Sequence, residues 1–569
     1  MRKRYNLFGC VLLLFTCLFA VPGFAGQAVK GEEKEYVILV SRAVQDDATW
    51  NPVVETLRTL HDALVIRFDK LPGETLETLK KAHPRYVAVV EKPENVTREY
   101  IRDMHRLSRA AGSDIFEAFL WGVITGYDAE SALRVIDDAR TPMSIGKALS
   151  TAPEMEFTSC FDRCAVISQD VTMNLWKQVE EAMAKADPVV VEKLKQVNEV
   201  IMEKIRTHQV VEDSLTRLEK ELNERIQAGR EKMEVKPMTA WSEKTQREDT
   251  LVQHEVGLDS VLYKFLDLYG QLDPEFLLTC SYGIDYLKIH KDQNVAVRAK
   301  EGRLCMDFTR KPEFLPRGES RRVYLATGNY GGAMFDKTDN LVTAWMKDGN
   351  VSALAGYCVP EWHGQAGWGT WKMWVTNAGR YTFAEAVFLN TQFILSRLND
   401  WNPKFLEVDY PETDDVNRDY RDNLATVTGA VGQEMVTLNQ MGYLYDRDVF
   451  VYYGDPKWDV RLKETPETSH YQVTTKRKGS KYILTIRTDD QFDRRQMTGN
   501  YYKEKSTPFN AATLGRLPFS YFFPERLQQP KLAKKLDFEG TVEVNENFIF
   551  IHDCYFEPNQ TYRVVLSVK

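Results

Sequence analysis

The chain has 569 residues, more than a single hydrophobic core usually organises, so its length predicts several domains. Hydrophobic residues make up 43% of the sequence and charged residues 27%, which is the balance of a soluble globular protein. The formal net charge of -8 excludes the uniformly basic composition typical of nucleic-acid-binding domains, and we expect no nucleic-acid partner.

The N-terminus has the pattern of a secretory signal. Positions 2–4 are all basic, and residues 7–21 form an apolar run that is shorter than the roughly 20 residues a membrane span needs. Small residues at positions 23 and 25 suit cleavage after Ala25. We therefore predict that residues 1–25 are a signal peptide and that the protein is secreted, periplasmic or held in the cell envelope. An uncleaved or lipid-anchored N-terminus is the alternative. No later stretch of the sequence is long and apolar enough to span a membrane.

Cysteine usage predicts neither a disulfide scaffold nor a zinc site. Of the eight cysteines, Cys10 and Cys17 lie in the predicted signal, which leaves six in a long chain. Cys160 and Cys164 are close enough to bridge in an exported protein, or they are two small buried residues. No second Cys/His pair with zinc-ligand spacing follows them. We expect no cofactor, although Asp336 and Asp339 are carboxylates of the kind that ligates calcium.

Two regions of the chain alternate strand and helix signals. In the first, residues 30–165, continuous apolar runs at 36–40, 63–66 and 86–90 are typical of parallel strands covered on both faces. Residues 49–62 between them have helical spacing. In the second region, residues 241–464, the predicted strands are 276–280, 323–326, 351–355 and 449–453, and the predicted helices are 340–347 and 383–398. Glycines follow several of these strands, and glycines beyond strand ends shape the crevice where open α/β sheets bind ligands.

The remaining regions have different patterns. Residues 166–240 are rich in Lys, Glu, Met and Leu, and apolar residues from Leu215 to Ile226 recur at three- and four-residue steps. They predict a helical insertion that packs on its own domain or, as the alternative, forms a partner-binding coiled coil. Beyond residue 465 short strand signals separated by turns predict an Ig-like β-sandwich over 465–569.

Four segments, in their order and spacing, resemble the gingipain-like (C25) cysteine peptidases, a caspase-fold family. They are residues 121–128, 323–330 and 354–362, followed by 452–456, which looks like the Gly-Asp-Pro segment that closes the catalytic domain in that family. The resemblance covers roughly residues 36–461. It implies an α/β fold with caspase-like parallel sheets flanked by helices, a following β-sandwich, and a cysteine-type endopeptidase activity.

The two residues that would perform that chemistry are absent from their expected places. In the family a His follows the end of one strand and a nucleophilic Cys ends the next, because adjacent parallel strands bring their carboxyl ends together. Here Tyr282 falls at the His position and Tyr330 at the Cys position. A phenol, with a pKa of about 10, cannot replace an imidazole as a base near neutral pH. The sequence therefore predicts a catalytically impaired relative, a pseudopeptidase that binds peptide or protein.

Two alternatives stay open. An active peptidase could use a displaced dyad, since Cys280 and Cys358 end predicted strands and His363 follows one of them. The ordinary interpretation of these residues is two small buried cysteines and a loop histidine bonded to backbone. The third hypothesis is a structural or interaction protein of the cell envelope.

The predicted binding cleft comprises Gly328, Asn329, Glu361 and Trp362. Further aromatic residues crowd the same stretch, namely Trp368, Trp371, Trp374 and Tyr381. If they line the crevice, their flat rings would suit a peptide or a glycan; otherwise they belong to the core.

Overall fold

The computed structural model describes most of the chain. The described residues are 33–151, 160–167, 262–280, 286–289, 293, 295–306, 313–327, 337–361, 363–410, 416–493 and 517–569. The predicted signal peptide and nearly all of the predicted helical insertion lie outside these ranges, and so do Tyr282, Gly328, Asn329, Tyr330, Asp336 and Trp362. The predicted domain boundaries at 165, 240 and 464 stay predictions.

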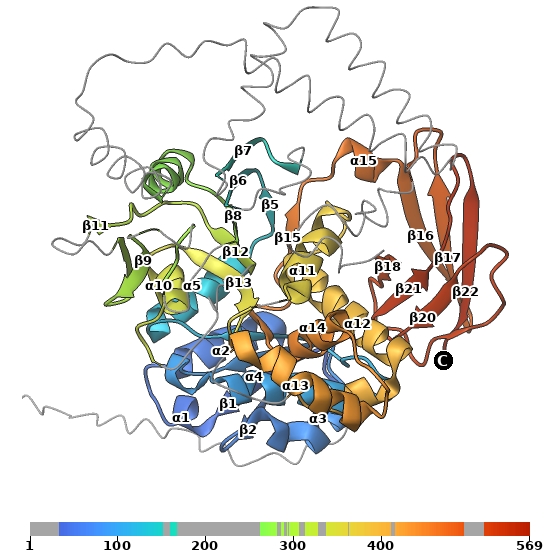
Figure 1. Ribbon diagram of the computed structural model, residues 1–569, viewed down its shortest axis with the longest axis horizontal. Helices are drawn as coiled ribbons and strands as arrows, with labels where there is room; N and C mark the ends of the chain where they lie inside the picture. Colours follow the sequence, from blue (N-terminus) through green and yellow to red (C-terminus); the bar gives the residue numbers. More distant parts are fainter. Residues whose placement is uncertain are drawn as a thin grey trace, which may run out of the picture.

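A ten-stranded sheet runs through the larger part of the molecule (Figure 1). In spatial order its strands are β2 (Leu64–Phe68), β1 (Tyr36–Ser41), β3 (Tyr86–Val90), β4 (Leu120–Ile124), β14 (Phe450–Tyr453), β13 (Val351–Tyr357), β12 (Arg322–Thr327), β8 (Phe276–Cys280), β6 (Lys147–Ser150) and β7 (Arg163–Val166). Neighbours pair in parallel except β13 and β14, which are antiparallel. The sheet is therefore two parallel halves that run in opposite directions, so their carboxyl ends lie at opposite edges.

Helices cover both halves of this sheet. They are α1 (Arg42–Gln45), α2 (Asn51–His61), α3 (Leu76–Ala82), α4 (Arg98–Ala111), α5 (Ala129–Ala139), α10 (Leu341–Lys347), α11 (Gln365–Val375), α12 (Phe383–Trp401), α13 (Val416–Val431) and α14 (Leu438–Asp446). Short elements connect them: 3₁₀ turns at Pro72–Thr75, Pro93–Asn95 and Pro403–Leu406, the paired strands β5 (Met143–Ile145) and β15 (Val460–Leu462), and a small sheet of β9 (Val297–Lys300), β10 (Arg303–Met306) and β11 (Glu313–Phe314). The α/β architecture predicted from the sequence is confirmed. None of the helices in the described ranges has the length and apolar character that crossing a bilayer requires.

Local sequence explains where the predicted helices begin. The hydroxyl of Thr382 accepts the N–H of Glu385, and the Glu385 carboxylate accepts the N–H of Thr382, which closes a capping box before α12. Asn340 caps α10 by accepting the N–H of Thr343 at 3.0 Å. Both helices start where the apolar periodicity predicted.

Helix α11 was not predicted, and its aromatic residues do not line a crevice. Trp371 and Trp374 are 2% and 0% exposed, and both pack on the ring of Phe276 in β8, with centroids 5.6 and 5.4 Å away. Gly369 lets α11 approach α12, since a Cβ there would lie 2.1 Å from Asn390 Oδ1. The glycines of this stretch therefore serve helix packing, and the core interpretation of the tryptophans is correct.

The C-terminal part is all-β, as predicted. A short helix, α15 (Pro466–Ser469), precedes it. One antiparallel sheet contains β16 (Tyr471–Lys478), β17 (Lys481–Thr488), β22 (Thr561–Ser567) and β19 (Lys531–Leu532). The other contains β18 (Phe519–Phe522), β21 (Phe548–His552) and β20 (Thr541–Val544). The two sheets enclose a hydrophobic core that includes Leu484, Ile549 and Val564. They lie at the right of Figure 1, beside the α/β part.

The described cysteines form no disulfide. Cys160 is buried and Cys164 is exposed, so these two residues do not bridge. Among the described residues, no group of three or more His, Cys, Asp or Glu side chains could hold a metal ion. Asp339 instead accepts the backbone N–H groups of Glu301 and Gly302, at 2.8 and 2.9 Å.

Strand β14 is the last strand of the first half, and it pairs in parallel with β4. The contact is short: Tyr453 pairs with Val123, and Gly454 N donates to Val123 O at 3.0 Å. The next residue of the Gly-Asp-Pro segment, Asp455, is buried and accepts the hydroxyl of Tyr36 at 2.9 Å. Because β14 runs antiparallel to β13, this segment lies at the edge opposite to the carboxyl ends of β12 and β13.

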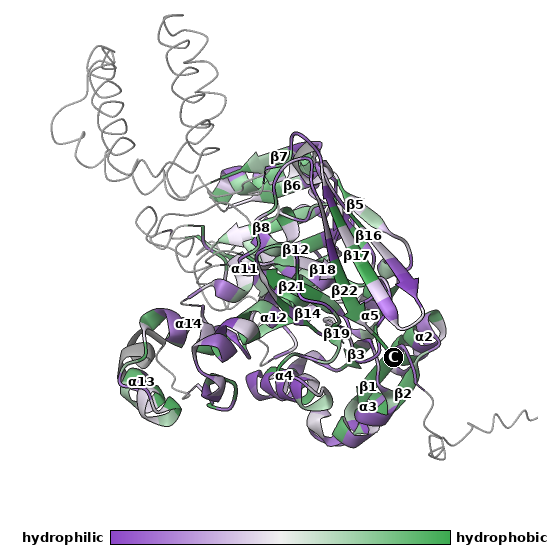
Figure 2. Cartoon of the chain, turned by 90° about the vertical axis from the view of Figure 1, so that its right-hand side faces the viewer, coloured by the Kyte–Doolittle hydropathy of each residue, from purple (hydrophilic) through white to green (hydrophobic). Residues whose placement is uncertain are grey.

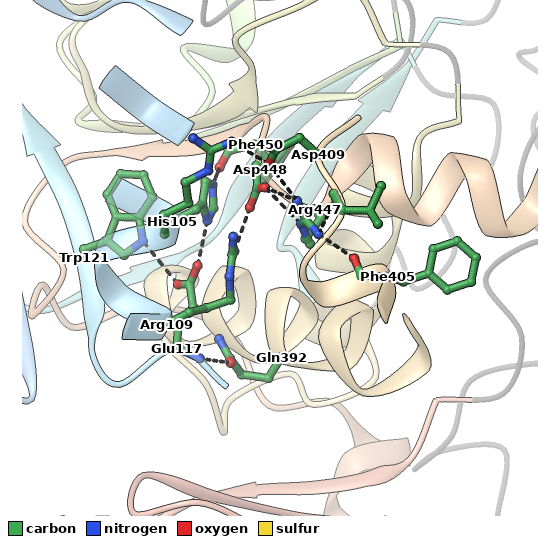
Figure 3. Close-up of polar contacts among 12 residues, drawn as sticks. His105, Arg109, Glu117, Trp121, Gln392, Phe405, Asp409, Arg447, Asp448 and Phe450 are labelled. Carbon is green, nitrogen blue, oxygen red and sulfur yellow. Dashed lines mark hydrogen bonds and ion pairs between the residues drawn. The ribbon is translucent and has the colours of Figure 1, made fainter. Parts of the chain in front are cut away.

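A buried polar network fixes the start of β14 to α4 (Figure 3). Asp448 lies between two guanidinium groups, accepting from Arg109 at 2.6 Å and from Arg447 at 2.7 Å. Burial alone would raise the pKa of Asp448, but the two arginines hold it well below its ordinary value. In the same network His105 contacts the Glu117 carboxylate at 2.7 Å and Phe450 O at 2.9 Å.

The contact between β4 and β14 leaves no room for a side chain at Gly122. An added Cβ at Gly122 would lie 2.4 Å from Gly454 O, a backbone atom that cannot move aside. Gly122→Ala should destabilise the protein by about 1–3 kcal/mol, measured as a lower urea midpoint of tryptophan fluorescence. Gly429→Ala in α13 is the control, because nothing lies within 4 Å of its added Cβ. An unchanged midpoint for Gly122→Ala would contradict this account.

The Asp448 network predicts a second strong effect. Asp448→Asn would leave Arg109 and Arg447 buried without their carboxylate, at a cost of about 3–5 kcal/mol. Asp137→Asn is the matched control: Asp137 bonds Arg140, but its side chain is 60% exposed, so we expect a loss below about 1 kcal/mol. Urea unfolding measures the loss of stability in each variant. Equal losses in the two variants would show that burial of the network adds nothing to the free energy of unfolding.

Candidate functional site

The carboxyl ends of β8 and β12 lie side by side at one level. Cys280 pairs with Thr327 in the parallel register, and Thr327 Oγ1 donates to Thr279 O at 3.0 Å. On the other side of β8, Thr151 Oγ1 accepts the N–H of Cys280 at 2.9 Å. The chain therefore leaves both strands from neighbouring points of the same edge. Tyr282 and Tyr330 follow those points by two and three residues and lie outside the described residues.

Cys280 and Cys358 end different strands of this edge. Cys280 is half-buried at the end of β8, and Cys358 directly follows β13. Strand β12 runs between them, so their backbones are about 10 Å apart at the usual strand spacing.

Cys358 has the environment of a structural cysteine. Its side chain is 4% exposed, and burial raises the pKa of its thiol to about 12. Its N–H donates to Val449 O at 2.9 Å, which continues the β13–β14 ladder. Within the described ranges, no hydrogen bond or ion pair joins it to His363. A thiol with so high a pKa provides almost no thiolate at neutral pH.

His363 is a buried, neutral histidine. Its Nε2 lies 3.1 Å from Asn439 Oδ1 of α14, and its ring packs against Tyr443 with centroids 5.5 Å apart. Burial lowers the pKa of the imidazole to about 4. Its Nδ1 lies 4.0 Å from Asp446 Oδ2, too far for a hydrogen bond. With that pKa the ring carries no charge near pH 7, so we do not regard the two groups as an ion pair.

Two buried carboxyl groups belong to this part of the fold: Asp446 lies beside the histidine, and the charge of Asp446 acts on Glu361. Asp446 Oδ2 accepts the N–H of Ala366 at 2.8 Å, in the first turn of α11, and the hydroxyl of Tyr357 at 3.3 Å. The positive end of the helix dipole favours a carboxylate there. Burial nevertheless raises the pKa of Asp446 to about 7. Burial, with the charge of Asp446 added, raises the pKa of Glu361 to about 8.

We call these residues the carboxyl cluster: Tyr357, Glu361, His363 and Asp446. Its two carboxyl groups have raised pKa values, so the cluster holds a bound proton at neutral pH. Glu361 is 5% exposed and largely protonated, so it can donate a hydrogen bond where an ordinary glutamate only accepts. The sequence indicated Glu361 and His363 as candidate residues. It gave no signal for Asp446, because nothing in the local pattern of α14 shows that its last residue points at the N-terminus of α11.

A separate cavity of about 330 Å3 lies between the α/β part and the β-sandwich. Arginines line it while bonding backbone carbonyls: Arg85 donates to Pro524 O at 3.1 Å, and Arg380 donates to Tyr471 O at 2.6 Å. These arginines join the two parts of the molecule, and Glu361, the described residue of the predicted cleft, does not line the cavity.

Comparisons with known proteins give only weak similarities. No protein-family model matches the chain, and no curated protein is significantly similar to it. Among solved structures, the Arg-specific cysteine proteinase gingipain R is 9% identical, with 81% of this chain and 86% of that chain covered at a TM-score of 0.34. A complex of the pro- and mature domains of RgpB from Porphyromonas gingivalis is 10% identical, with 80% and 87% covered at 0.30. A structure named only as a protease is 9% identical, with 95% and 97% covered at 0.31. TM-scores this low do not establish a common fold, so the family resemblance stays a hypothesis drawn from the sequence motifs.

The raised pKa of Glu361 predicts a pH-dependent stability. Because the folded-state pKa of about 8 exceeds the ordinary value of about 4.3, protonated Glu361 stabilises the fold below that ordinary value, and the contribution is lost as pH rises to about 8. Glu361→Gln keeps the neutral form at every pH. Its stability relative to the parent should therefore be higher at pH 9 than at pH 5, by on the order of 4 kcal/mol.

Urea unfolding of parent and variant at the two pH values measures this difference. Glu434→Gln, at an exposed position near α14, is the control and should give the same difference at both pH values. A Glu361→Gln effect that does not change with pH would refute the protonated, buried glutamate.

Proposed function

We propose that this chain is an exported relative of the gingipain-like cysteine peptidases that has lost the Cys–His chemistry and acts by binding a peptide or protein. The binding region is the crevice at the carboxyl ends of β8, β12 and β13. The observation that carries the proposal is the β8–β12 register, in which Cys280 pairs with Thr327. It supports the alignment that puts Tyr282 and Tyr330 at the two dyad positions, since equivalent strand ends precede both.

The environments of Cys358 and His363 favour this proposal over an active peptidase with a displaced dyad. A nucleophilic thiol needs a lowered pKa, and a general base needs a pKa near the operating pH. Cys358 has its pKa raised to about 12, and His363 has its pKa lowered to about 4. Neither shift is in the direction that catalysis requires.

The proposed cleft residues are Gly328, Asn329, Glu361 and Trp362. Glycine allows close approach of a ligand backbone, and Asn329 and protonated Glu361 supply hydrogen bonds to it. Trp362 supplies a large contact area at low conformational cost. Export, inferred from the signal pattern of residues 1–25, places this activity outside the cytoplasm.

Peptidase activity is tested on the chain from residue 26 onward. The protein is treated with a thiol-directed peptidase probe and offered a mixed peptide library. We expect no thiol-dependent cleavage, since losing an essential nucleophile or base lowers turnover by on the order of 10⁶. Cleavage that disappears in Cys280→Ala or Cys358→Ala would overturn the proposal and establish the displaced dyad.

Peptide binding has its own measurement and control. Capture of library peptides by the immobilised protein should fall at least about tenfold in Trp362→Ala, because tryptophans are frequent hot spots of binding. Phe314→Ala removes a ring that is 41% exposed on β11 and should leave capture unchanged. The double variant Tyr282→His with Tyr330→Cys tests whether these two residues occupy the dyad positions. Peptide cleavage by this variant would support the alignment. Absence of any peptide capture would favour the envelope-protein hypothesis instead.

A further inference from the structure

The larger sheet of the β-sandwich has one buried face and one exposed face. Along β17, Tyr482, Leu484 and Ile486 alternate inward and are at most 2% exposed. The residues between them point outward, because successive side chains of a strand lie on opposite faces. The cross-strand register extends this outward set over β16 and β22. These strands lie at the right of Figure 1, the side that Figure 2 turns toward the viewer.

Six cations occupy the outward positions, and we call them the basic face. They are Lys476 and Lys478 on β16, Lys481 and Arg487 on β17, Arg563 on β22, and Lys531 on β19, and all six are exposed. The four strands contain no Asp or Glu. No ion pair within the described residues involves any of the six. A chain with a net charge of -8 thus carries one sheet face with six uncompensated positive charges.

The register places like charges in direct opposition. Lys478 pairs with Lys481, and the next residues along that row are Ser567 and Lys531. Like charges opposite one another destabilise a sheet, so the fold alone gives no reason for this row. Lysines on an edge strand do discourage aggregation, which could explain Lys476 and Lys478 on β16. It does not explain Arg487 and Arg563, because β17 and β22 are interior strands.

The side chains between the cations indicate what kind of polyanion fits. Hydroxyl and amide groups occupy five of the outward positions, namely Gln472, Thr474, Thr485, Thr561 and Ser567, and half-buried Ile483 and Val565 occupy two more. No aromatic ring points outward from β16, β17 or β22; Tyr471 and Tyr482 are both 2% exposed and belong to the core. The face therefore lacks the stacking platform of single-stranded nucleic-acid binders and the aromatic anchors of interfacial membrane binders.

We propose that the basic face binds a linear acidic polysaccharide. The cations bind its carboxylate or sulfate groups, and the threonine and serine hydroxyls hydrogen-bond its sugar hydroxyls. Strands β16 and β17 have eight residues and β22 has seven, so they give a surface about 27 Å long and about 10 Å wide, enough for several sugar rings, which the two residues of β19 widen at one end. This site is separate from the proposed peptide crevice, and it does not depend on whether the crevice has any activity.

The proposal is tested with two acidic glycans and one neutral one. Heparin supplies sulfates, polygalacturonate supplies carboxylates, and dextran supplies neither. The chain from residue 26 should bind one or both acidic glycans and not dextran. Affinity should fall at least about tenfold between 0.1 M and 1 M salt, because the Debye length falls from about 10 Å to about 3 Å. Binding to neither acidic glycan would overturn the proposal.

Matched charge variants locate the site. Lys476→Gln, Lys478→Gln, Arg487→Gln and Arg563→Gln together should lower the affinity at least about tenfold. The control replaces four exposed lysines of the α/β part and loses the same charge: Lys70→Gln, Lys80→Gln, Lys81→Gln and Lys404→Gln. Equal losses in both variants would show non-specific attraction and overturn the assignment. Thermal melting checks the fold, and if the first variant unfolds, Arg487→Gln with Arg563→Gln replaces it, with an expected loss of about threefold.

Competing ligands and peptide capture complete the test. Single-stranded DNA or vesicles of anionic lipid that bind the basic face more tightly than either glycan, at equal charge concentration, would overturn the choice of a polysaccharide. Peptide capture should be unchanged in the basic-face variant. Its loss together with glycan binding would contradict two separate sites, whereas its absence in every variant would bear on the proposed function alone.

Discussion

The close contact between Gly122 in β4 and Gly454 beyond β14 determines how the whole α/β part is arranged. It joins β14 to the four preceding strands of the first half-sheet through one pair of residues, and only residues without side chains allow the two backbones to come so near. Because β14 pairs antiparallel with β13, the second half runs against the first. The carboxyl ends of β8, β12 and β13 consequently gather at one edge, while Asp455 closes the other edge against Tyr36 and away from the crevice.

The same segment that forms this joint also positions the carboxyl cluster. Asp446 and Asp448 are two residues apart and both are buried. Burial by itself raises the pKa of both carboxyl groups. Asp448 lies between Arg109 and Arg447, which keep it charged, whereas within the described ranges no arginine or lysine bonds Asp446 to oppose its desolvation. The ion pairs of Asp448 thereby anchor the chain, and this anchoring holds Asp446 against the first turn of α11.

Sequence patterns predicted the strands correctly. They did not predict features that depend on packing between residues far apart in the sequence. The apolar runs at 86–90 and 276–280 have the bounds of β3 and β8, because a continuous apolar run bounded by polar residues needs no further information. Glycines beyond strand ends were expected to shape a crevice, yet the stretch 364–369 starts α11, whose glycines pack against α12 and β13. The antiparallel direction of β14 and the role of Asp446 depend on partners far away in the sequence, and a local pattern does not encode these.

The buried carboxyl group of Glu361, at the carboxyl end of β13, is a feature that packing alone does not explain. A buried glutamate with a pKa raised to about 8 costs stability near neutral pH, and a glutamine or an apolar side chain would avoid that cost. Sites that retain such a cost are more often functional than structural. The cost falls at the edge where β8 and β12 also end.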